Sequence, residues 1–185
     1  MADYKAIHGK NILHLASDLD TAEGEGQLWF NTTSSDYKTI VKVAGAWATG
    51  GAINTARRDV ASGGAGIQTA ALCIGGDSPA HALVELYNGS SWSEVGDLNK
   101  ARANGGAAGL STAALAFGGT PPVSNETEVW DGSTWTEVAD LGTANNQVSG
   151  GGTAFVAISA GGESPNNGAT YEWNVPSTTK TFSSS

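Results

Sequence analysis

The chain has 185 residues, the length of one ordinary domain or of a domain with a small appendage. Its formal net charge is −9 at pH 7 and it has no basic stripe, which argues against nucleic-acid binding. No apolar run approaches the length of a membrane span, and the single Cys excludes an internal disulfide framework.

The composition favours short strands joined by tight turns. Gly accounts for 26 residues and charged residues for only 15%, and long periods rich in Leu, Glu or Lys are absent. Six Trp, four Tyr and four Phe argue against disorder, because disordered segments are poor in aromatic residues. We therefore expect an all-β fold. The N-terminus lacks the uninterrupted apolar core of a secretory signal, which predicts synthesis in a cytoplasm.

Residues 1–46 are predicted to form a separate N-terminal region. Residues 1–19 have weak periodicity and could form an extended arm that docks on a partner. Downstream, QLWFN (27–31) and YKTIVKV (37–43) alternate on either side of the polar turn TTSSD, which is the pattern of a β-hairpin. We expect this region to serve in attachment to a larger particle or in oligomerisation.

Trp47 marks the start of the second region, residues 47–185. It opens the segment AWATGGAINTARR, which matches SWSEVGDLNKARA around Trp92 and TWTEVADLGTANN around Trp135. A repeat therefore begins at this point of the chain.

The repeat has an offset of 43 residues. Each copy contains an apolar run that ends in a Gly-Gly pair, and then an aromatic residue followed by Asn or Asp. In the first two copies a Trp follows a few positions later. The predicted structural core of the repeat consists of Gly75, Gly76, Tyr87, Trp92, Gly118, Gly119, Trp130, Trp135, Gly161, Gly162 and Trp173.

The repeat units span roughly residues 47–91, 92–134 and 135–178. Each unit holds four strand-sized segments, which in the middle unit are WSEVGDL, NGGAAGL, TAALAFGG and ETEVWDG. Four short strands in about 40–50 residues is the spacing of a propeller blade. The glycines would allow positive φ near a crowded axis, and the aromatic rings would pack between neighbouring sheets.

The order of apolar strand, Gly-Gly pair, aromatic residue and Trp resembles the kelch repeat of β-propellers, over residues 47–178. The resemblance implies about three four-stranded blades. Closed propellers have about four to eight blades, so three blades cannot close alone. Residues 23–46 could supply a fourth, partial blade, or blades from two copies could stack into a set of about six. We expect a homo-oligomer, because the N-terminal hairpin lacks a Gly-Gly strand.

A second resemblance comes from the N-terminal region. The pattern EGQLWFNTTSSDYK followed by GAW resembles a short β element of bacteriophage tail-fibre and virion-appendage proteins. With the opening MADYKAIHGK and the passage WATGGAINTARR, the chain resembles kelch-like virion proteins of marine phages. This resemblance implies a non-enzymatic structural protein located in the virion, as a capsid decoration or a tail fibre or appendage. Its implied partners are other virion proteins, and it could face the host.

The kelch resemblance also raises copper oxidase chemistry, which some kelch propellers carry out with a crosslinked Tyr and Cys and with His ligands. Only Cys73 is available, and its place in the apolar run AALCIGG predicts that it packs as a small hydrophobic residue. His8, His14 and His81 show no metal-ligand spacing with one another or with the Cys. We therefore expect no metal and no cofactor.

Other catalytic patterns are weak. The hydrolase motif Gly-x-Ser-x-Gly is absent, and the glycine-rich segments GGAAG and SGGGT lack the Lys-Ser/Thr of a phosphate-binding loop. Carboxylates recur with the repeat period, which predicts solvent-facing strand and turn positions rather than one catalytic pair. These carboxylates are Glu85, Glu94, Asp97, Glu126, Glu128, Glu137 and Asp140. We expect no enzymatic activity and no catalytic residue.

A glycan-binding adhesin module is the alternative function. Trp and Tyr rings can stack on sugars, and the turn regions DSPAHA (77–82), TPPVSNE (120–126) and ESPNNGA (163–169) lie at corresponding places in the three units. Their sequences differ, which suits loops that present variable contacts to host surface glycans. For the Trp residues themselves we expect burial in the blade core. A small enzyme is the third alternative, and no site for it can be assembled from the sequence.

Overall fold

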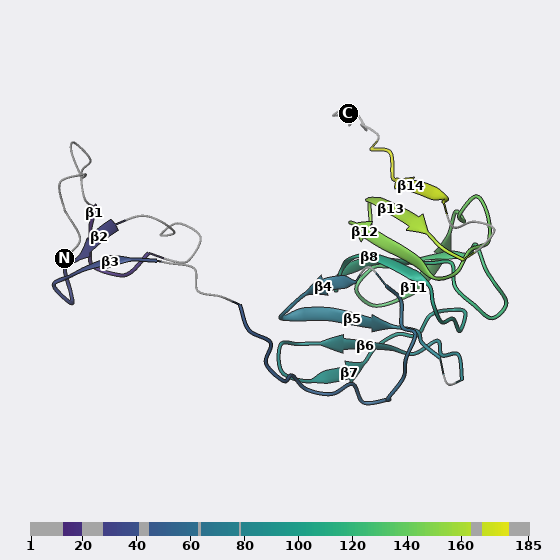
Figure 1. The fold of residues 1–185 in the computed structure, drawn as a ribbon, viewed down its shortest axis with the longest axis horizontal. Helices are drawn as coiled ribbons and strands as arrows, with labels where there is room; N and C mark the ends of the chain where they lie inside the picture. Colours follow the sequence, from purple (N-terminus) through teal and green to yellow (C-terminus); the bar gives the residue numbers. More distant parts are fainter. Residues whose placement is uncertain are drawn as a thin grey trace, which may run out of the picture. The chain divides into compact units, whose positions relative to one another are not determined.

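The computed structural model describes residues 13–19, 28–40, 45–62, 64–77, 79–163 and 168–177, and all regular structure in them is β-strand. The expected all-β fold is therefore confirmed. The chain divides into two compact units, Met1–Ala48 and Thr49–Ser185 (Figure 1). Within the described residues, no helix is long and apolar enough to cross a membrane.

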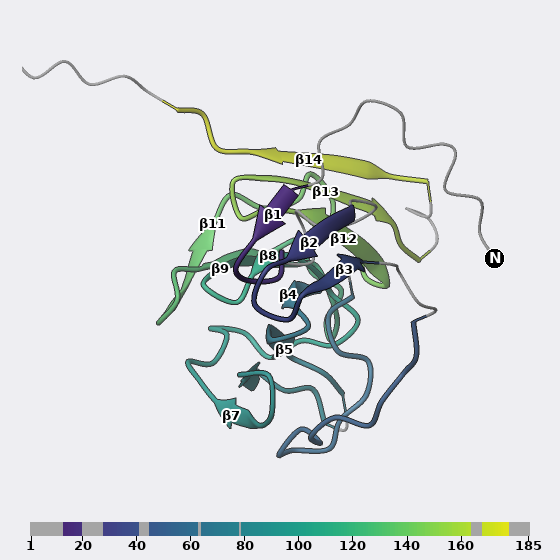
Figure 2. The same ribbon diagram turned by 90° about the vertical axis from the view of Figure 1, so that its left-hand side faces the viewer.

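The first unit contains one three-stranded sheet, made of β1 (Leu13–Leu15), β2 (Leu28–Asn31) and β3 (Asp36–Thr39). β2 lies between the other two strands (Figure 2); it forms the predicted antiparallel hairpin with β3 and pairs with β1 in parallel. The side-chain carbonyl of Asn31 closes the hairpin turn, because it accepts hydrogen bonds from the backbone N–H groups of Thr33 (2.9 Å) and Ser34 (3.0 Å). Part of the predicted arm is thus a strand of this sheet. The other predicted parts of this region at 1–12, 20–27 and 41–44 lie outside the described residues.

The second unit contains three antiparallel sheets that follow one another along the chain. The first sheet comprises β4 (Ala65–Ile67), β5 (Ala70–Ile74), β6 (Val84–Tyr87) and β7 (Trp92–Glu94). The second comprises β8 (Gly106–Leu110), β9 (Ala113–Phe117), β10 (Thr127–Trp130) and β11 (Trp135–Val138). The third comprises β12 (Val148–Gly152), β13 (Val156–Gly161) and β14 (Thr170–Asn174). Each strand pairs with the next in sequence, so every sheet is a simple meander.

The sheets are offset by one strand from the repeat units 47–91, 92–134 and 135–178. Trp92 begins β7, the last strand of the first sheet, and Trp135 begins β11, the last strand of the second sheet. The segment that opens a repeat unit therefore completes the sheet before it. Within the described residues, the third sheet has no strand in that place, and the residues that directly follow β14 are not in a strand.

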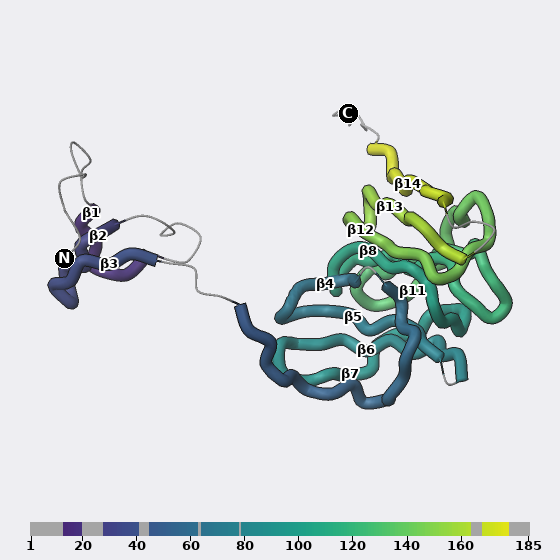
Figure 3. The backbone as a smooth tube through the Cα atoms, in the orientation of Figure 1, coloured from purple at the N-terminus to yellow at the C-terminus, as the bar shows by residue number. Residues whose placement is uncertain are grey.

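The three sheets meet along their innermost strands, β4, β8 and β12 (Figures 1 and 3). Ser62, just before β4, runs parallel to the start of β8: its N–H donates to the carbonyl of Gly105 (2.9 Å), and its carbonyl accepts from Ala107 (2.7 Å). The Ser62 hydroxyl donates to the carbonyl of Val148 at the start of β12. Gly150 is required where β12 approaches β8, because a Cβ there would lie 2.1 Å from the carbonyl oxygen of Ala107.

Apolar side chains fill both gaps between the sheets. Between the first and second sheets, Leu72, Ile74 and Val84 pack with small residues of β8 and β9 and with Trp130 and Trp135. Between the second and third sheets, the core is formed by Ala108, Leu115, Phe117, Val148 and Ala157. The second sheet is covered on both faces, which explains why β8 and β9 consist almost entirely of small and apolar residues.

The glycines of the three Gly-Gly pairs lie at the ends of β5, β9 and β13, and all six have positive φ, from 60° at Gly75 to 128° at Gly76. At Gly118, φ is 64° and a Cβ would lie 2.6 Å from the carbonyl oxygen of Asn145. The backbone geometry and the close approach of the next connection thus both exclude a side chain. Of the repeated aromatic residues, Trp130 and Trp135 are buried, and the half-buried ones are Tyr87, Trp92 and Trp173.

Candidate functional site

A buried Arg–Glu pair recurs on successive sheets. In the first sheet, Glu85 of β6 is 2% exposed and pairs with Arg57 from the connection that precedes the sheet. Arg57 also donates from Nε to the carbonyl oxygen of Gly75 (2.7 Å), and the backbone N–H of Asn54 donates to Oε2 of Glu85 (2.7 Å). The pair therefore ties the connection to the face of the first sheet.

The second sheet has the same arrangement. Arg102 donates from Nη2 to Oε1 of Glu128 in β10 (2.6 Å) and from Nη1 to the carbonyl of Gly118 (3.0 Å). The backbone N–H of Asn99 donates to Oε2 of Glu128 (2.7 Å), and its side-chain amide donates to the carbonyl of Trp135 (3.0 Å). The pattern Asn-x-x-Arg in one connection and Glu in the following sheet forms a module that the chain uses twice.

The prediction that the recurring carboxylates face solvent is wrong for Glu85 and Glu128. Both are buried, because the repeat brings each of them an arginine and backbone N–H donors. The remaining members of the set are exposed or half-buried: Glu94, Asp97, Glu126, Glu137 and Asp140. Recurrence with the repeat period therefore fits a buried structural pair as well as it fits a solvent-facing position.

The electrostatics of Glu85 are those of a structural group. Burial by itself would raise the pKa of this carboxyl, but hydrogen bonds from Arg57 and from the backbone N–H groups of Asn54 and Thr55 outweigh it. The pKa of Glu85 therefore lies below its ordinary value of 4.5. A carboxylate that is held ionised, with its oxygens engaged by protein donors, is poorly suited to transferring protons.

The third sheet lacks this module. Three replacements remove it: Gly142 stands at the position of Asn99, Asn145 at that of Arg102, and Tyr171 at that of Glu128. Asn145 keeps one contact of the arginine, because its side-chain amide donates to the carbonyl of Gly161 (2.9 Å). Among the described residues of the third sheet, nothing corresponds to the ion pair of Arg102 with Glu128 or to the backbone N–H of Asn99 that donates to Glu128.

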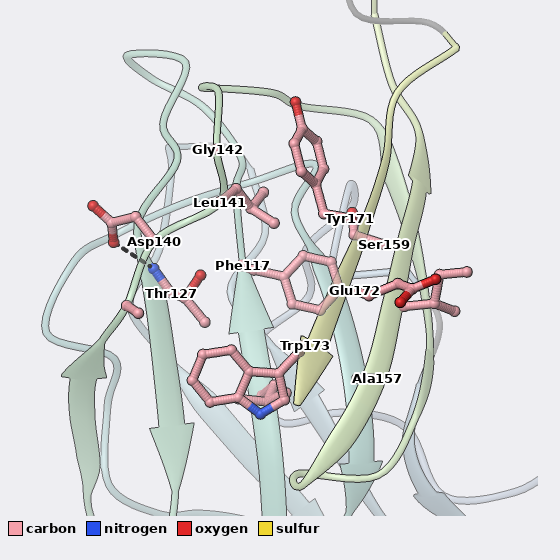
Figure 4. A pocket seen from close by; sticks show the side chains of 13 residues that line it. Phe117, Thr127, Asp140, Leu141, Gly142, Ala157, Ser159, Tyr171, Glu172 and Trp173 are labelled. Carbon is pink, nitrogen blue, oxygen red and sulfur yellow. Dashed lines mark hydrogen bonds between the residues drawn. The ribbon is translucent and has the colours of Figure 1, made fainter. Parts of the chain in front are cut away.

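A cavity of about 140 Å³ lies at this place, between the second and third sheets (Figure 4). Figure 4 shows Phe117 and Trp173 pointing into the space between the strands, with Leu141 and Tyr171 beside it. Ser159 also lines the cavity; its hydroxyl is buried and has no hydrogen-bond partner among the described residues. Because an unpaired buried hydroxyl is costly, the cavity is a place where a polar group of a ligand or partner could bind.

The aromatic rings at the rim of the cavity also differ from those of the other two sheets. Tyr87 packs against Trp92 with ring centroids 5.0 Å apart, and Trp130 packs against Trp135 at 5.3 Å. Trp173 takes the position of Tyr87 and Trp130 in the third sheet. In the part of the chain that the structure describes, no second ring packs against it.

The residues considered for metal or redox chemistry lie in separate elements. Cys73 is half-buried in β5, and burial raises the pKa of its thiol. His14 lies in β1 against the ring of Phe30 (5.4 Å between centroids), and His81 lies in the connection before β6. His8 is outside the described residues. Among those that are described, no group of three or more His, Cys, Asp or Glu could hold a metal ion.

The three turn regions considered for glycan binding do not form the cavity. Residues 120–126 are described completely, residues 77–82 lack Ser78, and residues 163–169 lack 164–167. No described residue of these regions lines the cavity, which is instead built from β9, β10, β13, β14 and the connection after β11.

Sequence reasoning missed the Asn-x-x-Arg module and the cavity that its loss leaves. The signal was present, because Asn54 and Arg57 match Asn99 and Arg102 within the aligned segments, and the third segment departs from both. What the sequence did not show is that a Glu on the following sheet is the partner of each Arg.

No protein-family model matches the chain, and no curated protein sequence matches it. Function must therefore be inferred from the residues themselves and from the exposed outer face of the third sheet.

Proposed function

We propose that this chain is a non-enzymatic structural protein of a bacteriophage particle, either a capsid decoration or part of a tail fibre or appendage. In this proposal the three sheets of the second unit are kelch-like blades, and β4, β8 and β12 line the axis of an incomplete β-propeller. The meander order of the strands and the positive-φ Gly-Gly pairs support the blade assignment. The resemblance of the N-terminal region to phage appendage proteins supports the location in a virion.

The observation that carries the proposal is a difference between the first and the third sheet. A connection covers the outer face of the first sheet, whereas the outer face of the third sheet is exposed. At the first sheet, the indole N–H of Trp92 donates to the carbonyl of Gly51 (3.0 Å), and an Arg–Glu pair also holds the preceding connection in place. At the third sheet, Val156 and Ile158 are 62% and 45% exposed on the outer face of β13. A sheet with an uncovered apolar face is suited to assembly with other proteins.

The partners in this proposal are other virion proteins and further copies of the chain. The first unit is the candidate for attachment to the particle, since it forms a compact sheet of its own. The buried carboxylates are consistent with a structural role, because Arg57 and Arg102 engage them inside the second unit.

Mass spectrometry of purified particles tests the proposed location. We expect peptides from both units at the abundance of a structural protein, far above the level at which abundant host proteins are carried over. A chain found only at the carry-over level would overturn the proposal.

Glycan binding is the second candidate function, and the cavity beside Trp173 favours it. Aromatic rings beside a buried hydroxyl that has no partner among the described residues are a fitting environment for a sugar ring. A glycan array followed by fluorescence titration tests this candidate. Binding that Trp173→Ala abolishes and Trp92→Ala preserves would support it, and an array without signal would exclude it.

A further inference from the structure

We infer that the segment around Trp47 of one copy adds to the free edge of β14 in another copy, as the fourth strand that the third sheet lacks. Trp47 then packs on Trp173 and covers the cavity. The inference rests on the proposal that the chain assembles with further copies, but it requires no particular particle. It specifies the two surfaces that meet and the register in which they pair.

Trp47 has the sequence context of a strand residue but lies in no strand. The segment that it opens matches those of Trp92 and Trp135, and these two residues begin β7 and β11. Residues 45–53 have no regular structure, and Trp47 is fully exposed (104%). A large aromatic residue that is wholly exposed in the isolated chain is a strong candidate for an anchor in an interface.

Among the described residues, β14 has a free edge where the equivalent strands have a partner. Trp92 pairs with Tyr87 of β6, and Trp135 pairs with Trp130 of β10. Trp173 of β14 is the equivalent of those two partners, and in the described residues no strand pairs with the outer side of β14. The same register would place Trp47 opposite Trp173.

The backbone of β14 is oriented to receive a strand in this register. The N–H of Gly161 donates to the carbonyl of Ala169 (3.0 Å), and the N–H of Val175 donates to that of Phe155 (2.9 Å). Hydrogen-bonded pairs alternate along antiparallel strands, so Glu172 directs its N–H and C=O away from β13, toward the free edge. Unpaired groups along a strand edge readily bind an added strand. In the expected register, Ala48 of the other copy lies opposite Glu172.

The cavity lies where the added Trp would pack. Trp135 belongs to the core between the first and second sheets, in contact with Trp130. A Trp at the equivalent place beside Trp173 would therefore enter the gap between the second and third sheets, which is where the cavity opens. The absence of a Trp equivalent to Trp135 thus explains both the opening of the cavity and the lack of a second ring beside Trp173.

The same association would cover the exposed face of the third sheet. Ile158 stands at the position of Leu72 and Leu115, and both of these are buried against the sheet that follows theirs. In the assembly, the first sheet of the second copy takes that place after the third sheet of the first copy. The contact is heterologous, head to tail, and closes into a ring or continues as a chain.

The occupant is a second copy because the chain cannot bring its own Trp47 to this edge while the first sheet is intact. Gly51 is held at the first sheet, because its carbonyl accepts a hydrogen bond from the indole N–H of Trp92 (3.0 Å). The four residues from Trp47 to Gly51 span at most about 14 Å. The third sheet is two sheet spacings away, about 20 Å.

Mass photometry and sedimentation of the full-length chain test the association. We expect the wild type to form assemblies of two or more copies, and Trp47→Ala to weaken the association by at least about tenfold. Tyr37→Ala is the matched control, because it removes another exposed aromatic residue (66%) outside the segment. A monomeric wild type, or a Trp47→Ala variant that associates like the wild type, would overturn the inference.

Proline on the strand edge gives a second test that leaves Trp47 in place. Glu172→Pro removes an N–H that faces the free edge and should abolish association while the chain stays folded. Glu94→Pro is the control on β7: the N–H of Val95 donates to the carbonyl of Val84 (3.0 Å), so the backbone of Glu94 faces outward as well. Equal association of the two variants would contradict the proposed edge.

Disulfide trapping tests the register. Cys73 is the only cysteine, so a Cys73→Ala background is used for all variants. A copy with Ala48→Cys, mixed with a copy with Glu172→Cys and oxidised glutathione, should form a disulfide-linked heterodimer, since facing residues lie within disulfide range. A mixture of Thr49→Cys with Glu172→Cys should not, because a shift of one residue turns the side chain to the opposite face. Equal trapping in both mixtures would contradict the register.

These measurements also separate the inference from the proposed function. A chain that stays monomeric and binds a sugar at Trp173 would overturn the inference and favour glycan binding. Detection in purified particles is independent of both outcomes, because it requires no contact between copies.

Discussion

At the scale of single residues, the second unit places two carboxylates where water cannot reach them. Glu85 is held by Arg57 and by backbone donors at Asn54 and Thr55, all from one short connection. The desolvation of two charges is compensated only when hydrogen bonds satisfy them, and removal of one partner leaves the other charge uncompensated. The pair therefore fixes the path of the connection over the sheet.

Glu85→Gln should destabilise the second unit by about 3–5 kcal/mol, because it leaves the Arg57 guanidinium buried without its counter-charge. Urea unfolding measures the effect. Glu94→Gln is the control: Glu94 lies directly opposite Glu85 on β7 but is exposed, and its replacement should change stability by less than about 0.5 kcal/mol. Similar urea midpoints for the two variants would show that the buried pair contributes little.

The pH dependence of stability follows from the lowered pKa of Glu85. A carboxyl whose pKa is lower in the folded state stabilises the fold above its ordinary, unfolded-state pKa of 4.5 and loses that contribution as the pH falls through the folded-state value. The urea midpoint of the wild type should therefore fall as the pH drops below the ordinary carboxyl value and through the lowered pKa of Glu85. Glu85→Gln should fall less steeply, since it lacks this titration. Parallel pH curves for the two proteins would contradict the assignment.

Residue periodicity shows that Glu85 and Glu128 recur, but not which way they point. A recurring carboxylate is buried or exposed according to its partner, and the partner arginines lie on a connection well before the strand that carries the Glu. This distance in sequence is the reason why the sequence predicted exposed carboxylates. The cavity beside Tyr171 could not be predicted for the same reason, because it depends on the loss of that partner.

At the scale of strands, the aromatic residues connect the two outermost strands of each complete sheet. Trp130 and Trp135 face each other across β10 and β11, and both contribute to the core between the first and second sheets. The hairpin that carries them is thereby attached to the preceding sheet.

Trp130→Ala and Trp135→Ala should each destabilise the second unit by about 3–5 kcal/mol, the cost of removing a large buried aromatic side chain. The same replacement at the half-buried Trp92 should cost less. Urea midpoints of the three variants measure the order. If both buried positions retained the midpoint of the wild type, the two rings would not contribute to the core.

Two glycines at equivalent positions separate backbone strain from steric contact. Gly118 and Gly161 both have positive φ, but a Cβ would meet the carbonyl oxygen of Asn145 only at Gly118. Gly161→Ala should therefore cost about 1–2 kcal/mol from φ alone. Gly118→Ala should cost at least about 1 kcal/mol more, because the backbone of the next connection must move. Equal costs in thermal or urea unfolding would show that φ alone determines the need for glycine.

The sequence predicts the strands themselves well, and it predicts their grouping less well. Apolar runs, turn glycines and the 43-residue offset locate the strands of the second unit, and the hairpin of β2 and β3 also follows from its alternation. The offset cannot show where a sheet begins, because any starting point gives the same period. In the folded chain, Trp92 pairs with β6 and Trp135 pairs with β10. These pairings show that each Trp belongs to the sheet that precedes it in the sequence.

At the scale of the whole molecule, the second unit consists of three sheets that follow one another. In the described residues, the outer face of the third sheet is not covered by another sheet. The second sheet is buried on both sides, and this condition makes β8 and β9 small and apolar throughout. β13 has the alternating pattern of a sheet covered on one side, yet its outer positions are Val156, Ile158 and Ala160 rather than charged residues. Apolar residues at these positions are the composition expected of a sheet that another sheet covers.

Ile158→Lys should therefore prevent association of copies while it leaves the isolated second unit as stable as before. The side chain is 45% exposed in the single chain, so a charged residue there meets water, but in the assembly it would be buried against the first sheet of the next copy. Leu110→Lys is the control, because Leu110 is similarly exposed (51%) but lies at the end of β8 in the middle sheet. Sedimentation should show monomers for Ile158→Lys and the assemblies of the wild type for Leu110→Lys, with similar urea midpoints for both. Undiminished association of Ile158→Lys would mean that the outer face of the third sheet stays open to solvent when the copies meet.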